Sequence, residues 1–213
     1  MNLDVPLRRL RPGSLPVDTA ALAEALIGCA LVRDSSDGRA AGRIVETEAY
    51  GIGDPASHAY CGKTKRNASM FLPPHRAYIY KIYGVATCAN VTSEAECVGA
   101  AILIRALAPI VGHDLMRRRR GIDAERDLCR GPGRLCQALA IDASFDGSDL
   151  LLGDRLWLAA PAGRASVGRS VRIGISKAAD RALRFYEVGN PFVSGRKALS
   201  TAASRQINSL PEG

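Results

Sequence analysis

The spacing of apolar positions predicts a helix near the start of the chain. Apolar residues recur at helical intervals over residues 17–27, and Asp18 or Thr19 is suited to cap the first turn. Gly28 follows the last apolar position, and glycine readily takes the left-handed conformation that ends many helices. We therefore expect an amphipathic helix that serves as scaffold.

The pattern then changes to the β-prone runs that are typical of strands. Residues 30–33 and 41–50 form two such runs, separated by the turn-rich segment 34–38, so we expect antiparallel neighbours. Side chains alternate between the two faces of a strand. Glu46, Glu48 and Tyr50 are therefore expected to project from the same face of the second strand.

A hairpin and several shorter elements are predicted further along. Residues 76–92 hold two β-prone runs on either side of Tyr83 and Gly84, and glycine supplies the positive φ of a tight turn. Tyr83 is thus expected at the tip of a hairpin. Other predictions are a long functional loop over residues 51–67, strands over 99–106, 156–159 and 171–175, helices over 109–119 and from Gly131 through 139, and a turn at 189–191.

Length and composition favour one compact unit. The chain has 213 residues, 47% of them hydrophobic, which suits a single domain spanning residues 1–213 with flexible ends over about 1–16 and 196–213. No run of eighteen apolar residues and no signal-peptide pattern is present, so we expect no membrane association. We expect an intracellular protein, cytoplasmic or nucleoid-associated, or nuclear in a eukaryote.

The cysteines do not have the spacing of a metal or cluster site. Six are spread along the chain with no Cys-x-x-Cys pair, and the histidines lie far from them in sequence. We expect reduced, mostly buried thiols, with Cys61 in the predicted loop either oxidation-sensitive or a quiet, partly buried thiol. Neither a metal nor another cofactor is predicted.

Clustered cations suggest an anionic partner. The formal net charge is +8, and Lys63, Lys65 and Arg66 lie within the predicted loop. A second run extends from Arg117 to Arg120. Such clusters can contact DNA phosphates, although the second run is equally well interpreted as a solvated helix face balanced by the acids that follow it.

Five of the six tyrosines lie in one short stretch that also contains two acids and a histidine. Glu48, at the end of a strand and beside an aromatic residue, is a candidate general acid or base. The alternative is a structural salt bridge with Arg43 or Arg105, a role that Glu46 fits better. Flat rings beside acids in a basic protein suggest a pocket for a nucleic-acid base.

Three residues of this stretch could enclose such a base. Tyr50, His58 and Tyr80 could stack around a nucleotide extruded from a duplex, although each alone is more often a core or rim residue. Tyr83 at a hairpin tip could fill the space that the extruded nucleotide leaves, and the alternative is an incidental exposed aromatic residue.

Blocks of residues from about Leu22 to Ser194 carry a family resemblance. They are residues 43–50 (RIVETEAY), 54–60 (DPASHAY), 66–67 (RN), 70–71 (MF), 78–80 (YIY), 83–84 (YG), Asn90, 103–107 (LIRAL), 128–135 (LCRGPGRL), 184–186 (RFY) and 189–194 (GNPFVS). Through these blocks, in this order, the chain resembles the alkyladenine (3-methyladenine) DNA glycosylase family.

The resemblance implies a fold and an activity. The fold is one mixed α/β domain around a curved antiparallel β-sheet, with surrounding helices and a protruding hairpin that intercalates into DNA. Glu48 would be the general base that activates water, and Arg105 would help to position that water. Tyr50, His58 and Tyr80 would clasp the flipped base above Asn90, and Tyr83 would intercalate.

The implied substrate is double-stranded DNA containing damaged purines: 3-methyladenine, 7-methylguanine and, as further candidates, hypoxanthine and ethenoadenine. The chain departs from mammalian members at Val85 and Ala86, which are smaller than their counterparts, so the wedge is expected to depend mainly on Tyr83. No lysine falls in a matched catalytic position. We therefore expect a monomeric enzyme that hydrolyses the N-glycosidic bond without cutting the strand.

Other functions remain open at this point. Gly131-Pro132-Gly133 before a helix, with Asp149 and Asp154 further on, would suit a helix-hairpin-helix glycosylase. The second alternative is a damaged-base binding protein without catalysis, which would have no use for Glu48 and Arg105 as a water-positioning pair. A relative acting on RNA or free nucleosides would not need a duplex wedge.

Overall fold

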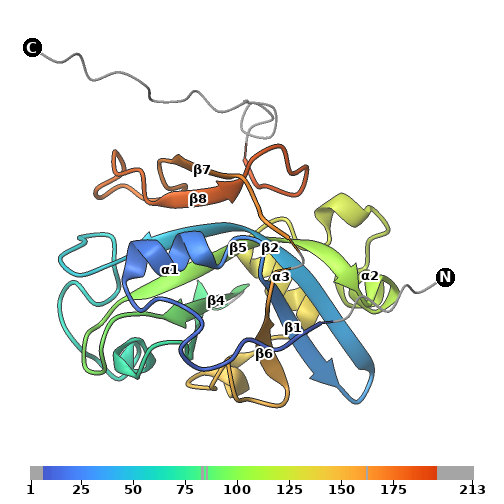
Figure 1. Cartoon of the computed structure of the whole chain (residues 1–213), viewed down its shortest axis with the longest axis horizontal. Coiled ribbons are helices and arrows are strands. Elements are labelled where there is room, and N and C mark those ends of the chain that lie inside the picture. Colours follow the sequence, from blue (N-terminus) through green and yellow to red (C-terminus); the bar gives the residue numbers. More distant parts are fainter. Residues whose placement is uncertain (1–6, 83, 85, 162, 196–213) are drawn as a thin grey trace, which may run out of the picture.

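A single antiparallel sheet organises the structure, a computed structural model that describes residues 7–82, 84, 86–161 and 163–195 (Figure 1). The strands run in the order β3-β4-β5-β2-β1-β6, while β8 pairs with β2 and β7 pairs with β8. The strands are β1 (Ala30–Ser35), β2 (Gly38–Tyr50), β3 (Ala77–Ile82), β4 (Ala86–Thr92), β5 (Ala101–Val111), β6 (Leu156–Ala159), β7 (Val167–Ser170) and β8 (Arg184–Glu187).

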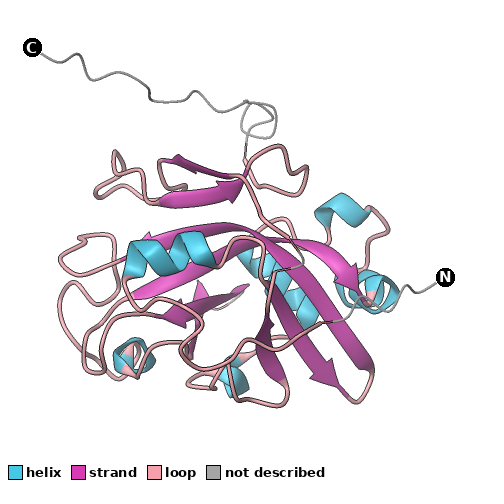
Figure 2. Cartoon of the chain, viewed as in Figure 1, coloured by secondary structure: helices cyan, strands magenta, loops and turns pink. Residues whose placement is uncertain are grey.

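Strand β2 is the centre of this arrangement. It pairs along its length with β5 on one side, while on the other it pairs first with β1 and then, over Glu46–Glu48, with β8. The register with β5 shifts on both sides of Glu46, and such bulges bend a strand and increase its twist. The sheet is therefore curled, and β7 and β8, which join it through β2, lie above the other strands in the view of Figures 1 and 2.

Short helices complete the mixed α/β fold. Helix α1 (Thr19–Ala25) starts where the Asp18 carboxylate accepts a hydrogen bond from the Ala21 N–H at 2.8 Å. Helix α3 (Pro132–Leu139) begins with proline in its first turn and buries its apolar face against β4 and β5. The remaining helical segments are α2 (His113–Arg120), η1 (Ala68–Phe71), η2 (Glu125–Asp127) and η3 (Ala143–Phe145).

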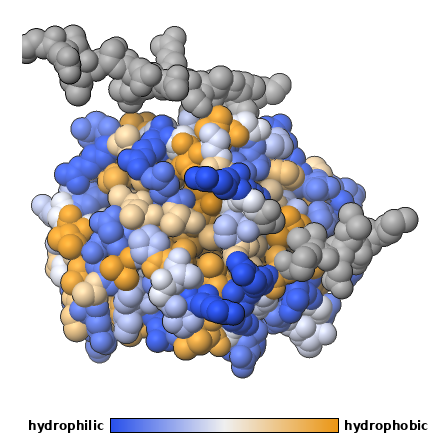
Figure 3. Space-filling model, viewed as in Figure 1, coloured by the Kyte–Doolittle hydropathy of each residue, from blue (hydrophilic) through white to orange (hydrophobic). Residues whose placement is uncertain are grey.

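One large hydrophobic core packs the helices against the sheet. It includes Leu22 of α1 and Leu26 at its C-cap, Leu135 of α3 and Ile102 of β5, all fully buried. The face of the molecule shown in Figure 3 mixes hydrophilic and hydrophobic residues. Among the residues that the structure describes, no helix is both long and apolar enough to cross a membrane.

Most predicted elements are confirmed, with longer strands than the sequence suggested. The predicted hairpin is the antiparallel pair β3–β4, and Gly84 between them has a φ of +71°. Tyr83 and Val85 lie outside the described residues. Of the predicted flexible ends, residues 7–16 are described and bury Leu10 and Leu15, whereas 1–6 and 196–213 lie outside.

One predicted element begins at the wrong residue, and another is wrong. The helix expected over 109–119 is present but begins only at His113, because Pro109 still pairs with Gly42 in the sheet and Gly112, at φ +79°, separates strand from helix. Residues 171–175 are not a strand, because the Ile173 N–H donates to the Glu48 carboxylate at 2.8 Å instead of to a neighbouring strand.

The helix-hairpin-helix alternative is also wrong. Gly131 does precede a helix, but the fold around it is an antiparallel sheet with only short helices. Asp149 forms an ion pair with Arg76 at 2.9 Å and accepts hydrogen bonds from the next turn of its own loop.

Candidate active site

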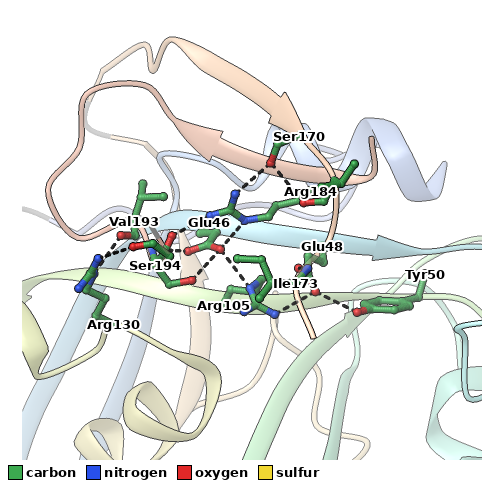
Figure 4. Close-up of polar contacts among 12 residues, drawn as sticks. Glu46, Glu48, Tyr50, Arg105, Arg130, Ser170, Ile173, Arg184, Val193 and Ser194 are labelled. Atoms are coloured by element: carbon green, nitrogen blue, oxygen red, sulfur yellow. Dashed lines mark hydrogen bonds and ion pairs between the residues drawn. The ribbon is translucent and has the colours of Figure 1, made fainter. Parts of the chain in front are cut away.

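Two buried acids and two buried arginines lie close together where β2 pairs with both β5 and β8 (Figure 4). Glu46 and Glu48 have no exposed surface, and Arg184 is 1% exposed. Arg105 donates from Nε to Glu46 and from Nη1 to Glu48, both at 3.0 Å. The two acids thus share one face of β2, as their alternation predicted, and their charges are balanced by the two arginines.

Glu48 is held by three donors. Its Oε2 accepts from Arg105 and from the Tyr50 hydroxyl at 2.9 Å, and its Oε1 accepts from the Ile173 N–H. Glu48 therefore does form a salt bridge with Arg105, one of the two pairs considered if its role were structural. The alternative pair with Arg43 is not formed, since Arg43 binds Glu187 at 2.8 Å.

The two acids keep Arg105 charged. Burial lowers the pKa of Arg105, but the nearby carboxylates of Glu48 and Glu46 outweigh that effect and raise it above its ordinary value. Glu46 is held still more firmly, by Arg184 Nε at 2.6 Å and by the Ser194 N–H at 2.6 Å. The guanidinium of Arg105 is consequently fixed at both ends.

A cavity of about 120 Å³ lies beside this cluster, and four of its nine described lining residues have aromatic rings. The four residues predicted for a base pocket, Tyr50, His58, Tyr80 and Asn90, all line it. Ala56, Met70, Tyr78, Ala101 and Ile175 complete the lining. Glu48 is not a lining residue, but the Tyr50 hydroxyl connects it directly to the cavity wall.

Tyr78, Tyr80 and His58 form one side of the cavity. The rings of Tyr78 and Tyr80, two residues apart on β3, have centroids 5.4 Å apart, and the His58 ring meets Tyr80 edge-on at 4.6 Å. His58 Nδ1 lies 2.9 Å from the Tyr78 hydroxyl, within hydrogen-bonding distance. Burial, and then the positive charge of Arg66, lower the pKa of His58, which favours its neutral form.

The tyrosine hydroxyls remain protonated. Burial raises the pKa of Tyr78 to about 12, and it also raises the pKa values of Tyr50 and Tyr80. Asn90 is buried beneath them and donates from Nδ2 to the Tyr78 carbonyl at 2.9 Å. The described residues that line the cavity therefore present flat rings and neutral polar groups, and none of them is a carboxylate.

The predicted phosphate-contacting cations lie in two separate places. Lys63 and Arg66 belong to the loop that lines the cavity, where Lys63 lies over the Phe71 ring at 5.8 Å and Arg66 donates to the Lys81 carbonyl at 3.3 Å. Lys65 is exposed in the same loop. On α2, Arg117 pairs with Asp114 at 2.8 Å, while Arg120 donates to the Leu128 carbonyl at 3.1 Å.

Three contributors to the site escaped the sequence analysis. Tyr78 lines the cavity, and its alternation with Tyr80 was a usable signal. Arg184 and Ile173 reach the acids from segments more than a hundred residues away along the chain, which no local pattern announces.

The cysteines are free thiols, with Cys61 and Cys97 exposed and the other four buried. Across the described ranges, no group of three or more histidine, cysteine, aspartate or glutamate residues is arranged to hold a metal ion.

The class of protein that this fold and site fit is a DNA glycosylase, because a base-sized aromatic cavity adjoins a buried carboxylate. The family model described as methylpurine-DNA glycosylase matches residues 14–191. A Mesorhizobium japonicum protein named "Putative 3-methyladenine DNA glycosylase" is 53% identical over 186 residues, covering 87% of this chain and 89% of that protein.

Two further relatives carry the same name. The one from Paraburkholderia phytofirmans is 48% identical over 202 residues, 94% of this chain and 95% of that protein. The one from Methanoculleus marisnigri is 48% identical over 184 residues, 84% of this chain and 95% of that protein. The chain belongs to the methylpurine-DNA glycosylase family, whose activity is hydrolysis of N-glycosidic bonds in DNA repair.

Proposed function

We propose that this protein flips alkylated purines out of duplex DNA, holds them in the aromatic cavity and hydrolyses their N-glycosidic bond to leave an abasic site. The observation that carries the proposal is the hydrogen bond from the Tyr50 hydroxyl to Glu48, which puts the wall of a base-sized cavity in contact with a buried acid. The substrates would be 3-methyladenine and 7-methylguanine, with hypoxanthine and ethenoadenine as further candidates.

The cavity suits a flat, positively charged base. Alkylation at N3 or N7 of a purine gives the base a positive charge, and a cation is attracted to the faces of aromatic rings. Tyr50, His58 and Tyr80 would stack around the base, while Asn90 would limit the purine substituents that fit at the floor. The neutral His58 adds no opposing charge.

Glu48 would act as the general base. A carboxylate has about four acceptor positions, and protein donors use three of those of Glu48. The position left on Oε1 is where we place the attacking water. Arg105 would orient the carboxylate, and the negative charge of Glu48 would stabilise the oxocarbenium-like sugar as the bond breaks.

The leaving group needs little assistance, because an alkylated cationic base departs neutral. Among the described residues that line the cavity there is no lysine to attack the sugar. We therefore propose simple hydrolysis without strand cleavage by a monomer. By the family resemblance, Tyr83 would act as the wedge that enters the gap left by the flipped base. It lies outside the described residues.

Base release from duplexes containing a single 7-methylguanine, 3-methyladenine, hypoxanthine or ethenoadenine tests the proposal. Wild-type protein should release at least one alkylated base and leave an alkali-labile but uncut strand. Glu48→Gln should lose release while still binding the lesion. Glu187→Gln is a matched control, because Glu187 pairs with Arg43 instead of joining the acid cluster. Lesion binding by wild type without release would instead support a damage-binding protein.

A further inference from the structure

An arginine lies against one wall of the base cavity. The Arg172 guanidinium carbon sits 4.6 Å from the centroid of the Tyr50 ring. Its side chain has no exposed surface, and it is not among the residues that line the cavity. Tyr50 does line the cavity, so Arg172 covers the face of that ring that is turned away from the base.

The guanidinium is firmly anchored. It forms an ion pair with the buried Asp54, and its Nη atoms also donate to the Ala49 carbonyl at 2.9 Å and the Ala178 carbonyl at 3.2 Å. Its Nε is buried and has no hydrogen-bond partner within the described chain. The Tyr50 ring is therefore one of the contacts that Arg172 has in place of water.

A cation on one face of a ring weakens the attraction of that ring for a second cation. The attraction arises because the ring's negative face is polarised toward the positive charge, and Arg172 already draws that electron density away from the cavity. Asp54 cancels the charge of Arg172 at long range, but the guanidinium is the group in contact with the ring. The cation–π attraction of Tyr50 for a base should thus be reduced.

Among the described residues, no arginine or lysine lies over the ring of Tyr80, the other tyrosine proposed to enclose the base. The aromatic contacts of Tyr80 are with His58 and Tyr78, and burial keeps the pKa of its own hydroxyl above the ordinary value. Among the described residues that line the cavity, His58 is the one titratable acid or base besides the tyrosine hydroxyls. The two walls that would enclose a base are therefore electrostatically unequal.

We infer that Arg172 is a specificity-determining residue that lowers the preference of this cavity for positively charged over neutral bases, and that Tyr80 provides most of the remaining preference. The inference rests on the proposed function, in which Tyr50 and Tyr80 enclose the flipped base. It adds to that function a cause for the difference in affinity between cationic and neutral bases.

The test measures binding of two bases that differ in charge and little in shape. One duplex carries 7-methylguanine and a second carries its neutral isostere 7-methyl-7-deazaguanine, each bound by Glu48→Gln protein so that no base is released. The quantity is the ratio of the two dissociation constants. Replacing both charges, with Arg172→Leu and Asp54→Leu together, avoids leaving a buried unpaired ion. The preference for the cationic base should rise about 5-fold.

A second pair of substitutions, Arg172→Gln with Asp54→Asn, keeps polar groups in place and should give the same direction of change. Arg169→Leu is the matched control, since Arg169 lies 4.9 Å from the Phe185 ring and does not line the cavity. It should leave the ratio unchanged. An unchanged or lower ratio in the folded Arg172 proteins would overturn the inference.

A third variant tests the inference without altering Arg172. Tyr80→Leu should nearly abolish the preference for the cationic base, because it leaves only the Tyr50 ring, whose attraction for a cation Arg172 already reduces. A preserved preference would refute the inference. If the Glu48→Gln parent does not distinguish 7-methylguanine from undamaged DNA at all, the proposed function fails instead.

Discussion

Arg184 and Glu46 form a buried ion pair, with 2.6 Å between Nε of the arginine and Oε1 of the acid. Arg184 comes from β8 and Glu46 from the centre of β2, and these two strands are paired. Arg184 also donates to the Ser170 hydroxyl at 2.9 Å and to the Ser194 carbonyl at 2.8 Å. The pair therefore fastens the layer formed by β7 and β8 to the strand that carries Glu48.

Loss of this arginine should strongly destabilise the fold. Arg184→Met leaves the fully buried Glu46 with one cation where it had two, and breaking a buried pair from one side costs about 3–5 kcal/mol. We expect a loss near the lower value, because Arg105 remains bound to Glu46. Unfolding in urea, monitored by circular dichroism, gives this change in the free energy of unfolding.

The control for this loss is an exposed pair of the same kind. Arg134 and Asp127 are 49% and 45% exposed and 3.0 Å apart. Surface pairs contribute about 0–1 kcal/mol, so Arg134→Met should change the free energy of unfolding little. Equal losses in the two variants would mean that the buried pair is not what secures β8.

Arginine at position 105 should not be replaceable by lysine. Its fork donates from Nε to Glu46 and from Nη1 to Glu48, and a single ammonium group cannot reproduce two parallel contacts with fixed directions. Arg105→Lys should fold, bind lesion-containing DNA and release base about 100-fold more slowly, the order expected for a lost preorganised contact. Single-turnover kinetics measure the rate, and a near-normal rate would contradict a positioning role for the guanidinium.

Local patterns predicted the parts of the site that are carried by single strands. Alternation along β2 placed Glu46, Glu48 and Tyr50 together, and turn chemistry at Gly84 predicted the strands that carry Tyr80. Each of these is set by the period of a strand, which the sequence displays directly.

The remaining parts depend on long-range packing. Arg184 pairs with Glu46 only because the four-residue strand β8 joins the free edge of β2. Arg172 lies in a segment whose apolar residues resemble a strand, yet its neighbour Ile173 binds a carboxylate instead of a strand. A β-prone sequence without a free strand edge beside it does not form a strand, and no local pattern reveals where such an edge lies.

The two groups of cations should differ in their contribution to DNA binding. Lys65 is exposed in the loop that lines the cavity, whereas Arg117 is paired with Asp114 on α2, which follows the end of β5 remote from the cavity. Ala101, at the first end of β5, lines the cavity. At the rise of an extended strand, the other end of β5 lies about 30 Å from it. Lys65→Ser should therefore reduce the slope of log affinity against log salt by about 1.

Arg117→Ser is the matched substitution and should leave that slope unchanged. Fluorescence anisotropy with a labelled duplex at several salt concentrations gives both values. A slope that falls for Arg117→Ser and not for Lys65→Ser would place the DNA over α2 instead of over the predicted loop.

His58 should titrate at a lower pH than an ordinary histidine. Burial is the main cause of the lowered pKa, and the charge of Arg66 adds to it. The unfolded chain binds the proton near the ordinary value of about 6.5, so stability should fall as the pH drops through that value toward the lower folded pKa. Protonation of the folded protein also puts a positive charge beside a cationic base, so lesion binding should weaken as the pH drops through the lower folded pKa.

Arg66→Gln separates the two causes. It removes the charge but not the burial, so the pKa of His58 should rise while staying below its ordinary value. Two-dimensional NMR of the imidazole signals follows the titration, with His58→Asn assigning the resonance. The pH below which the Glu48→Gln protein no longer binds 7-methylguanine DNA should rise together with the pKa of His58. Because that protein releases no base, a parallel rise would trace the loss of binding to the charge on His58.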